Sequence, residues 1–297
     1  MNKNISLSRR IFIIFNYLFL CSLMVICILP FLHLIAVSLS SSINAAAGII
    51  GFIPKGFTLK SYEFLATKPE FLRALLVSII RVILGTSLNM FMVVITAYPL
   101  SKSKESLVGR TIYIWFFVFT MYFGGGMIPS YMVVKMTGLI NHIWALIIPG
   151  ALSVWNMVLL LNFFRQIPKE LEEAAIIDGA SQWSVLWRIY LPVSKPALAT
   201  ILLFSIVGHW NSWFDGVLYI NSPKLYPLQT YLSTIVLDIN KQSMSTLSPE
   251  GLERLKNISE QSVRCAQIFL GALPILLVYP CLQRYFIKGL VIGSVKG

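Results

Sequence analysis

Few residues in this chain could do chemistry, and they are spread along its length. The three histidines, His33, His142 and His209, lie on separate segments, so their spacing gives no catalytic or metal-binding group. Acidic residues cluster only between positions 170 and 178, and no GxxxxGK[ST] phosphate loop occurs. We therefore predict a chain that is not an enzyme and has no catalytic residue, no metal site and no cofactor of its own.

The composition indicates which elements position these residues. Of 297 residues, 57% are apolar and 12% are charged, against about 45–50% and 25% in a soluble domain. The net charge is +12, but the cations stand singly or in pairs at the edges of apolar stretches, which argues against a nucleic-acid partner. The composition predicts an all-α integral membrane protein that spans the lipid several times.

Six stretches are long and apolar enough to cross a bilayer, which takes about 20 residues as a helix. We predict one membrane domain over residues 1–297. Its spans are expected at about 11–39, 74–98, 111–134, 143–164, 197–214 and 265–283. Within the third, the run Gly124, Gly125 and Gly126 followed by Pro129 predicts a break in the helix.

The charges between these spans predict an orientation. The first stretch is about twice as long as the ~7–15-residue core of a signal peptide, so we interpret it as a retained span. Lysine and arginine are more frequent in the segments that are internal when the N-terminus is cytoplasmic. We expect a multi-pass protein of the cell membrane with both termini in the cytoplasm.

The longest internal excursion, residues 167–192, reads IPKELEEAAIIDGASQWSVLWRIYLP. Pro168 suits a first helical position, and the acids that follow complement the helix dipole. Gly179 permits a turn. A second short helix is expected with Trp183, Leu186, Trp187 and Tyr190 on one face, ended by Leu191 and Pro192. The sequence predicts a helical hairpin, and an amphipathic hairpin lying on lipid headgroups is the alternative.

The EAA triplet, the glycine three residues later and the closing Leu-Pro resemble the EAA loop of binding-protein-dependent ABC importer permeases. The resemblance continues through FGGGMIPSYMVVKMTGLI (123–140), WALIIPG (144–150), GHWNSWFDG (208–216), YPLQ (226–229) and QRYFIKGLVIGSVKG (283–297). It is specific for the carbohydrate branch, in particular the maltose-type second permease of the lipoprotein-partnered oligosaccharide subgroup.

This resemblance implies the type I importer permease fold and a role in moving a sugar, expected to be an oligosaccharide. It implies three partners: a second homologous permease, a cytoplasmic ABC ATPase dimer that binds ATP and Mg²⁺, and an extracytoplasmic sugar-binding protein, expected to be a lipoprotein. The loop would couple to the ATPase through Glu173, Ala174, Ala175, Asp178, Gly179, Leu191 and Pro192, with Glu173 pairing with an ATPase arginine.

The same resemblance gives the C-terminal tail, residues 284–297, a role. It implies that the tail reaches the interface between the two ATPase chains, with glycines allowing an extended backbone to pass. The expected contact residues there are Gly293, Lys296 and Gly297. A frayed cytoplasmic end is the alternative.

Several polar and aromatic residues could line a solute path. Aromatic rings stack on sugars while amides bind hydroxyls, and an arginine inside a span needs a partner or a water-filled path. The candidates are Arg81, Asn89, Trp210, Asn211 and Trp213. An interfacial aromatic belt and hydrogen bonds between helices explain the same residues without a solute.

Two other classes of protein are alternatives to an ABC permease. An ion-coupled secondary transporter should show intramembrane carboxylates or an inverted repeat, and only Asp215 comes near. A membrane-embedded enzyme needs a nucleophile, paired acids or metal ligands, which the spacing does not supply. An ABC permease for a solute other than a sugar is a further alternative.

Overall fold

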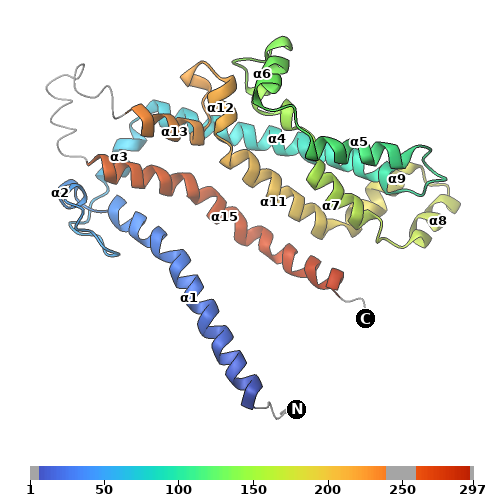
Figure 1. The fold of residues 1–297 in the computed structure, drawn as a ribbon, viewed down its shortest axis with the longest axis horizontal. Coiled ribbons are helices and arrows are strands. Elements are labelled where there is room, and N and C mark those ends of the chain that lie inside the picture. The colour runs from blue at the N-terminus through green and yellow to red at the C-terminus, as the bar shows by residue number, and fades with distance from the viewer. Residues whose placement is uncertain (1–6, 239–258, 295–297) are drawn as a thin grey trace. The chain divides into compact units, whose positions relative to one another are not determined.

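The computed structural model describes residues 7–238 and 259–294, and every regular element within them is helical. The chain forms two compact units, one of residues 1–69 and 235–273 and the other of residues 70–234 and 274–297. Figure 1 labels the helices in chain order. The absence of strands from the described part of the chain confirms the all-α prediction.

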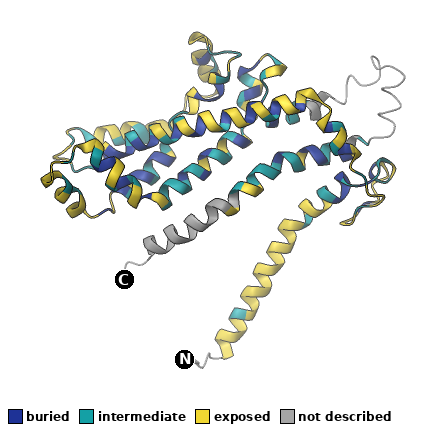
Figure 2. Cartoon of the chain, turned by 180° about the vertical axis from the view of Figure 1, so that it is seen from behind, coloured by how far each residue is buried: buried dark blue, intermediate teal, exposed yellow. Residues whose placement is uncertain are grey.

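The first unit contains α1 (Leu7–Ser38), α2 (Ser42–Ala46), α3 (Lys60–Ala66) and the first part of α15 (Glu260–Ser294). Helix α1 has 32 residues, which is about 48 Å at 1.5 Å per residue. Most of its large apolar side chains are exposed, as Figure 2 shows. Only its C-terminal end packs within the unit, where Ala36 and Val37 contact Ala45 and Ile50. An apolar helix without protein cover suits lipid.

The second unit is built around α4 (Pro69–Ser101), a helix of 33 residues. Its other elements follow in chain order: α5 (Arg110–Tyr122), α6 (Met127–Met136), η1 (Ile143–Leu146), η2 (Ile148–Gly150), α7 (Val154–Phe164), α8 (Lys169–Ile177), α9 (Gln182–Val185), η3 (Leu186–Tyr190), α10 (Leu191–Val193), α11 (Lys195–Asn211), α12 (Phe214–Tyr219), η4 (Pro223–Leu225), α13 (Leu228–Asp238) as far as residue 234, and α15 from residue 274.

The largest core of this unit lies where α4, α7, α11 and η3 meet. Val93 and Ala97 of α4 are fully buried beside Leu160 of α7, Leu186 of η3 and Ile201 of α11. Small and medium apolar residues at spacings of three and four allow the helices to pack closely. This core fixes the segment around residues 167–192 against the C-terminal half of α4.

Three helices are long and apolar enough to cross a membrane within the described residues, and the number rises to as many as six if each bent pair of helices is one span. The single helices are α1, α4 and residues 261–278 of α15. The bent pairs are α5 with α6 at 113°, residues 143–150 with α7 at 44°, and residues 182–193 with α11 at 83°.

The helix break predicted at the glycine run is present. Helix α5 ends at Tyr122, and α6 starts after Gly126, whose φ of +84° is disfavoured for residues with a Cβ. Helix α5 has 13 residues, about 20 Å at 1.5 Å per residue, which is shorter than the ~30 Å hydrocarbon core. The stretch 111–134 is therefore two helices with a sharp turn between them.

The structure corrects the hairpin prediction at three points. Pro168 precedes α8 and is not its first helical residue. In the second helix, Val185, Leu186 and Tyr190 face the core of the second unit and are buried. Trp183 and Trp187 are exposed, because they lie on the side of the helix away from this core. Leu191 and Pro192 do not end the second helix, which continues to Val193. Pro192 has no N–H to donate to the preceding turn, and the π-helical turn at residues 186–190 is wider than an α-helical one, so the helix accommodates the proline.

The prediction of an extended C-terminal tail is also wrong for its first part. Helix α15 continues through Ser294, so residues 284–294 are helical. The glycines there cost about 1 kcal/mol each in a helix, and the surrounding isoleucine, leucine and phenylalanine residues favour continuation. The last three residues lie outside the described part of the chain.

Candidate functional site

The hairpin, defined here as residues 167–193, turns at Gly179. The glycine has a φ of +81°, and its N–H donates to the carbonyl of Ile176 at 2.9 Å. The next N–H, of Ala180, donates to the carbonyl of Ala175 at 2.9 Å. These two bonds form a Schellman motif, which ends a helix with a residue in the left-handed region. Ser181 then caps α9 by accepting from the N–H of Ser184.

The hairpin exposes both charged and apolar side chains. Trp183 and Trp187 are 61% and 59% exposed, although large aromatic side chains are costly to leave in water. Glu173 is exposed on α8. Exposed residues of the hairpin also include Leu171, Ala174, Ile176, Ile177, Asp178, Gly179 and Pro192. This combination is typical of a surface that receives a partner.

Two of the predicted coupling residues face the chain's own core. Ala175 and Leu191 are half-buried and pack against the core of the second unit. Ala175 also supplies the carbonyl that accepts from Ala180. Their role in this structure is to hold the hairpin in place, and Glu173, Ala174, Asp178, Gly179 and Pro192 present its surface.

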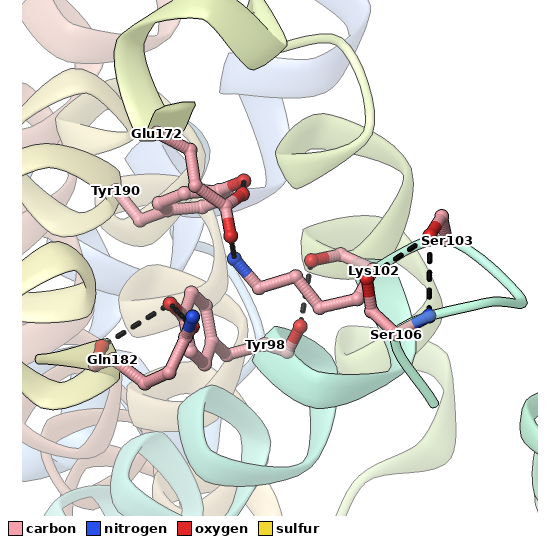
Figure 3. A network of polar contacts seen from close by, with 8 residues as sticks. Tyr98, Lys102, Ser103, Ser106, Glu172, Gln182 and Tyr190 are labelled. Carbon is pink, nitrogen blue, oxygen red and sulfur yellow. Dashed lines mark hydrogen bonds and ion pairs between the residues drawn. The ribbon is translucent and has the colours of Figure 1, made fainter. Parts of the chain in front are cut away.

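Sequence analysis missed a polar network behind the hairpin, shown in Figure 3. Lys102, just beyond the C-terminus of α4, forms an ion pair with Glu172 of α8 at 2.6 Å from Nζ to Oε1. The hydroxyl of Tyr190 donates to the other oxygen of Glu172, also at 2.6 Å. The hydroxyl of Tyr98 donates to Oε1 of Gln182 at 2.7 Å. The partners are far apart in sequence, so no local pattern marks them.

Burial sets the electrostatics of this network. Desolvation lowers the pKa of Lys102, and its bond with Glu172 acts in the opposite direction. Desolvation raises the pKa of Tyr190, and its hydrogen bond to the carboxylate of Glu172 raises it further. Tyr190 is therefore a neutral donor, and the bond with Glu172 opposes the desolvation that disfavours the charged form of Lys102.

Arg81 forms an ion pair within its own chain. Its guanidinium pairs with the carboxylate of Asp215, and Nη1 donates to the carbonyl of Ser212 at 3.1 Å. The Arg81 side chain is 2% exposed and that of Asp215 is 24% exposed. One turn further along α4, the ring of His209 packs so closely on Gly85 that a Cβ there would lie 2.5 Å from it. The partner expected for Arg81 is thus Asp215.

Asn89 lies in a buried hydrogen-bond cluster between helices. Its Oδ1 accepts from Ser205 of α11 at 2.6 Å and from Asn156 of α7 at 3.5 Å. Its Nδ2 donates to the carbonyl of Ala151 at 3.2 Å. These bonds satisfy the polar atoms of Asn89 inside the protein and join α4, α7 and α11. Asn89 therefore fits the alternative given above, in which it forms hydrogen bonds between helices and does not line a solute path.

The remaining candidates for a solute path differ in exposure. Trp210 is buried, whereas Asn211 is exposed and Trp213 is 48% exposed. Of the tail candidates, Gly293 lies in the last turn of α15, and Lys296 and Gly297 fall outside the described residues. Among the described residues, no group of three His, Cys, Asp or Glu side chains could hold a metal ion.

Long apolar helices, bent helix pairs and an exposed hairpin define a class: a multi-pass, all-helical membrane protein. Residues 6–291 match the family described as the binding-protein-dependent transport system inner membrane component. The chain belongs to this family, which consists of permease subunits of ABC transporters, with ATP hydrolysis located in a separate subunit.

Relatives of known name cover nearly the whole chain. It is 43% identical to Protein LplC of Bacillus subtilis (strain 168), over 97% of this chain and 96% of that protein. It is 38% identical to the polygalacturonan/rhamnogalacturonan transport system permease protein YtcP of the same strain, over 98% and 100% of the two chains.

A solved structure has the same fold. It is described as a bacterial ABC transporter involved in the import of the acidic polysaccharide alginate. The match has a TM-score of 0.84 and 30% identity and covers 95% of this chain and 98% of that chain. The fold is therefore that of an ABC importer permease, as the resemblance implied.

Proposed function

We propose that this chain is a permease subunit of an ATP-driven ABC importer that moves a sugar, expected to be an oligosaccharide, from an extracytoplasmic binding protein into the cytoplasm. The observation that carries the proposal is similarity over the full length to a permease named for polygalacturonan and rhamnogalacturonan, supported by the match to an alginate importer. The proposed partners are a second permease, a cytoplasmic ATPase dimer that binds ATP and Mg²⁺, and a sugar-binding lipoprotein.

Uptake by the purified complex tests this function. The complex isolated through a tag on this chain should take up labelled oligosaccharides into proteoliposomes only with ATP and the binding protein present. Both neutral and uronic-acid oligosaccharides should be offered. Ionophores that collapse proton and sodium gradients should leave uptake unchanged. Uptake driven by an ion gradient without ATP would establish a secondary transporter instead, and uptake of a non-sugar solute alone would overturn the sugar assignment.

We propose six membrane spans, with both termini and the hairpin in the cytoplasm. The charge asymmetry of the sequence supports this orientation. The proposed spans are the three long helices, the first two bent pairs and α11, because residues 182–193 of the third pair belong to the cytoplasmic hairpin. Lys224, exposed before α13, then lies outside, and Asp178, exposed at the hairpin turn, lies inside.

Cysteine labelling tests the orientation at these two positions. In a background without the four native cysteines, Lys224→Cys should react with an impermeant maleimide in sealed cells. In cells that lack the partner ATPase, Asp178→Cys should react only after the membrane is permeabilised, and this reaction also shows that the position is accessible. Labelling of Asp178→Cys in sealed cells would invert the proposed arrangement.

The hairpin is proposed as the site at which the ATPase docks. Its exposed tryptophans and the exposed carboxylate of Glu173 offer apolar contact and a charge for an arginine of the partner. The same surface could lie on lipid headgroups, but a carboxylate facing them lacks the cationic character that such surfaces favour. Ala174 has a small side chain and Gly179 has none, so a partner chain can approach the backbone closely beside Glu173.

The C-terminal residues are proposed to contact the same ATPase. In this arrangement residues 284–294 extend the last helix toward the cytoplasm, and Gly293, Lys296 and Gly297 meet the partner. For the solute path, the exposed Asn211 and Trp213 are the proposed contacts. Arg81, Asn89 and Trp210 are buried and support the helices behind that path.

A further inference from the structure

Adjacent glutamates of α8 point in different directions. Glu173 is exposed on the hairpin surface, whereas Glu172 is turned toward α4 and binds Lys102 and Tyr190. Successive residues on a helix differ by about 100° around its axis, so one helix presents a carboxylate to each side. The two acids therefore have separate tasks, and the ABC family motif accounts for only one of them.

The ion pair of Lys102 and Glu172 is enclosed by aromatic rings. Nζ of Lys102 lies 4.0 Å from the ring centroid of Tyr98 and 4.3 Å from that of Tyr190. The two side chains are 11% and 17% exposed. The rings of Tyr98 and Tyr190 also contact each other edge to face at 5.0 Å. A cation held by a carboxylate and two ring faces has little freedom to move independently of either helix.

The helix that receives this contact is bonded to other segments along its length. Asn89 joins α4 to α7 and α11, and Arg81 joins it to Asp215. Near its N-terminal end, Ser78 accepts the N–H of Leu228, at the start of α13, at 2.7 Å. Because α4 is one continuous helix that ends at Ser101, next to Lys102, displacement of this end moves these attachment points as well.

We propose that Glu172 and Lys102 are positioning residues that fasten the hairpin to α4, so that movement of the docked ATPase is passed to the membrane helices. This inference rests on the proposed function, since it assigns the transmission step behind the docking surface. Tyr190 and Tyr98 complete the attachment by holding the carboxylate and the second helix of the hairpin. Breaking the pair leaves the docking surface present but loosely connected to α4.

The test separates docking from transmission. In the purified complex, Glu172→Ala should retain the ATPase and hydrolyse ATP, while sugar imported per ATP falls about tenfold, a typical size for coupling between sites. Glu170→Ala, which removes an exposed glutamate from the same helix, is the matched control and should leave the ratio unchanged. Lys102→Met should resemble Glu172→Ala, and the two changes together should be no worse than either.

Exchanging the two charges distinguishes loss of the ion pair from a general folding defect. Glu172→Lys combined with Lys102→Glu should recover at least part of the import per ATP that each single change removes. An unchanged ratio in Glu172→Ala would overturn the proposal, as would additive losses in the double variant. Loss of the ATPase from Glu172→Ala would also overturn it, by making Glu172 a docking residue. Failure of the proposed function is distinct: the ATPase would then be absent from the unsubstituted complex.

Discussion

Replacing Asp215 with leucine should remove most of the assembled permease from the membrane. The change leaves the guanidinium of Arg81, which is 2% exposed, without its carboxylate. Breaking a buried ion pair by removing one partner costs roughly 3–5 kcal/mol, and the partial exposure of Asp215 places the expected loss near the lower end. Immunodetection of the membrane fraction and the thermal midpoint of the detergent-purified complex measure the effect.

Two further variants show whether the charge causes this loss. In the unsubstituted chain the hydroxyl of Ser212 donates to Oδ1 of Asp215 at 2.8 Å. Asp215→Asn keeps an oxygen that accepts from Ser212 and from Arg81, so the loss of assembled permease should be smaller than in Asp215→Leu. Arg81→Met combined with Asp215→Leu removes both charges and should recover much of the stability lost in the single leucine variant. Equal losses in all three variants would contradict a role for the ion pair.

Changing the hairpin surface or its turn should reduce ATP-driven import strongly without preventing membrane insertion. Glu173→Ala removes an exposed carboxylate proposed to pair with the ATPase, so the amount of co-purified ATPase should fall severalfold. Gly179→Leu places a Cβ at a φ of +81°, a strain of about 1–2 kcal/mol, and should misalign the helices. Quantifying retained ATPase and ATP-dependent sugar uptake tests both variants.

A second pair of variants tests whether the loss of import in Gly179→Leu comes from the backbone conformation at this position. No atom lies within 4 Å of a Cβ added at this position, so strain comes from the backbone conformation and not from crowding inside the chain. Asparagine tolerates the left-handed region better than other residues, so Gly179→Asn should retain more import than Gly179→Ala. Equal import in the two variants, or normal import in Gly179→Leu, would remove the turn from the coupling mechanism.

The sequence by itself determined the features that depend on neighbouring residues. Hydropathy identified the apolar helices, because a span must satisfy its own backbone hydrogen bonds and contact lipid over about 20 residues. Glycine at 179 and the run at 124–126 marked a turn and a break, because Gly179 and Gly126 have a positive φ that most other residues disfavour. The EAA loop and its flanking motifs identified the family, which the match over residues 6–291 confirms.

The tertiary structure alone decided which polar residues meet. Glu172 lies 70 positions from Lys102, and Asp215 lies 134 positions from Arg81, so no local spacing relates either pair. Packing of α4 against α7, α11 and the hairpin also decided that Tyr190 is buried and Trp187 exposed, although both fit the same predicted face. Long-range contacts form only when the whole set of helices packs together, and a buried charge then selects the partner that best offsets its desolvation.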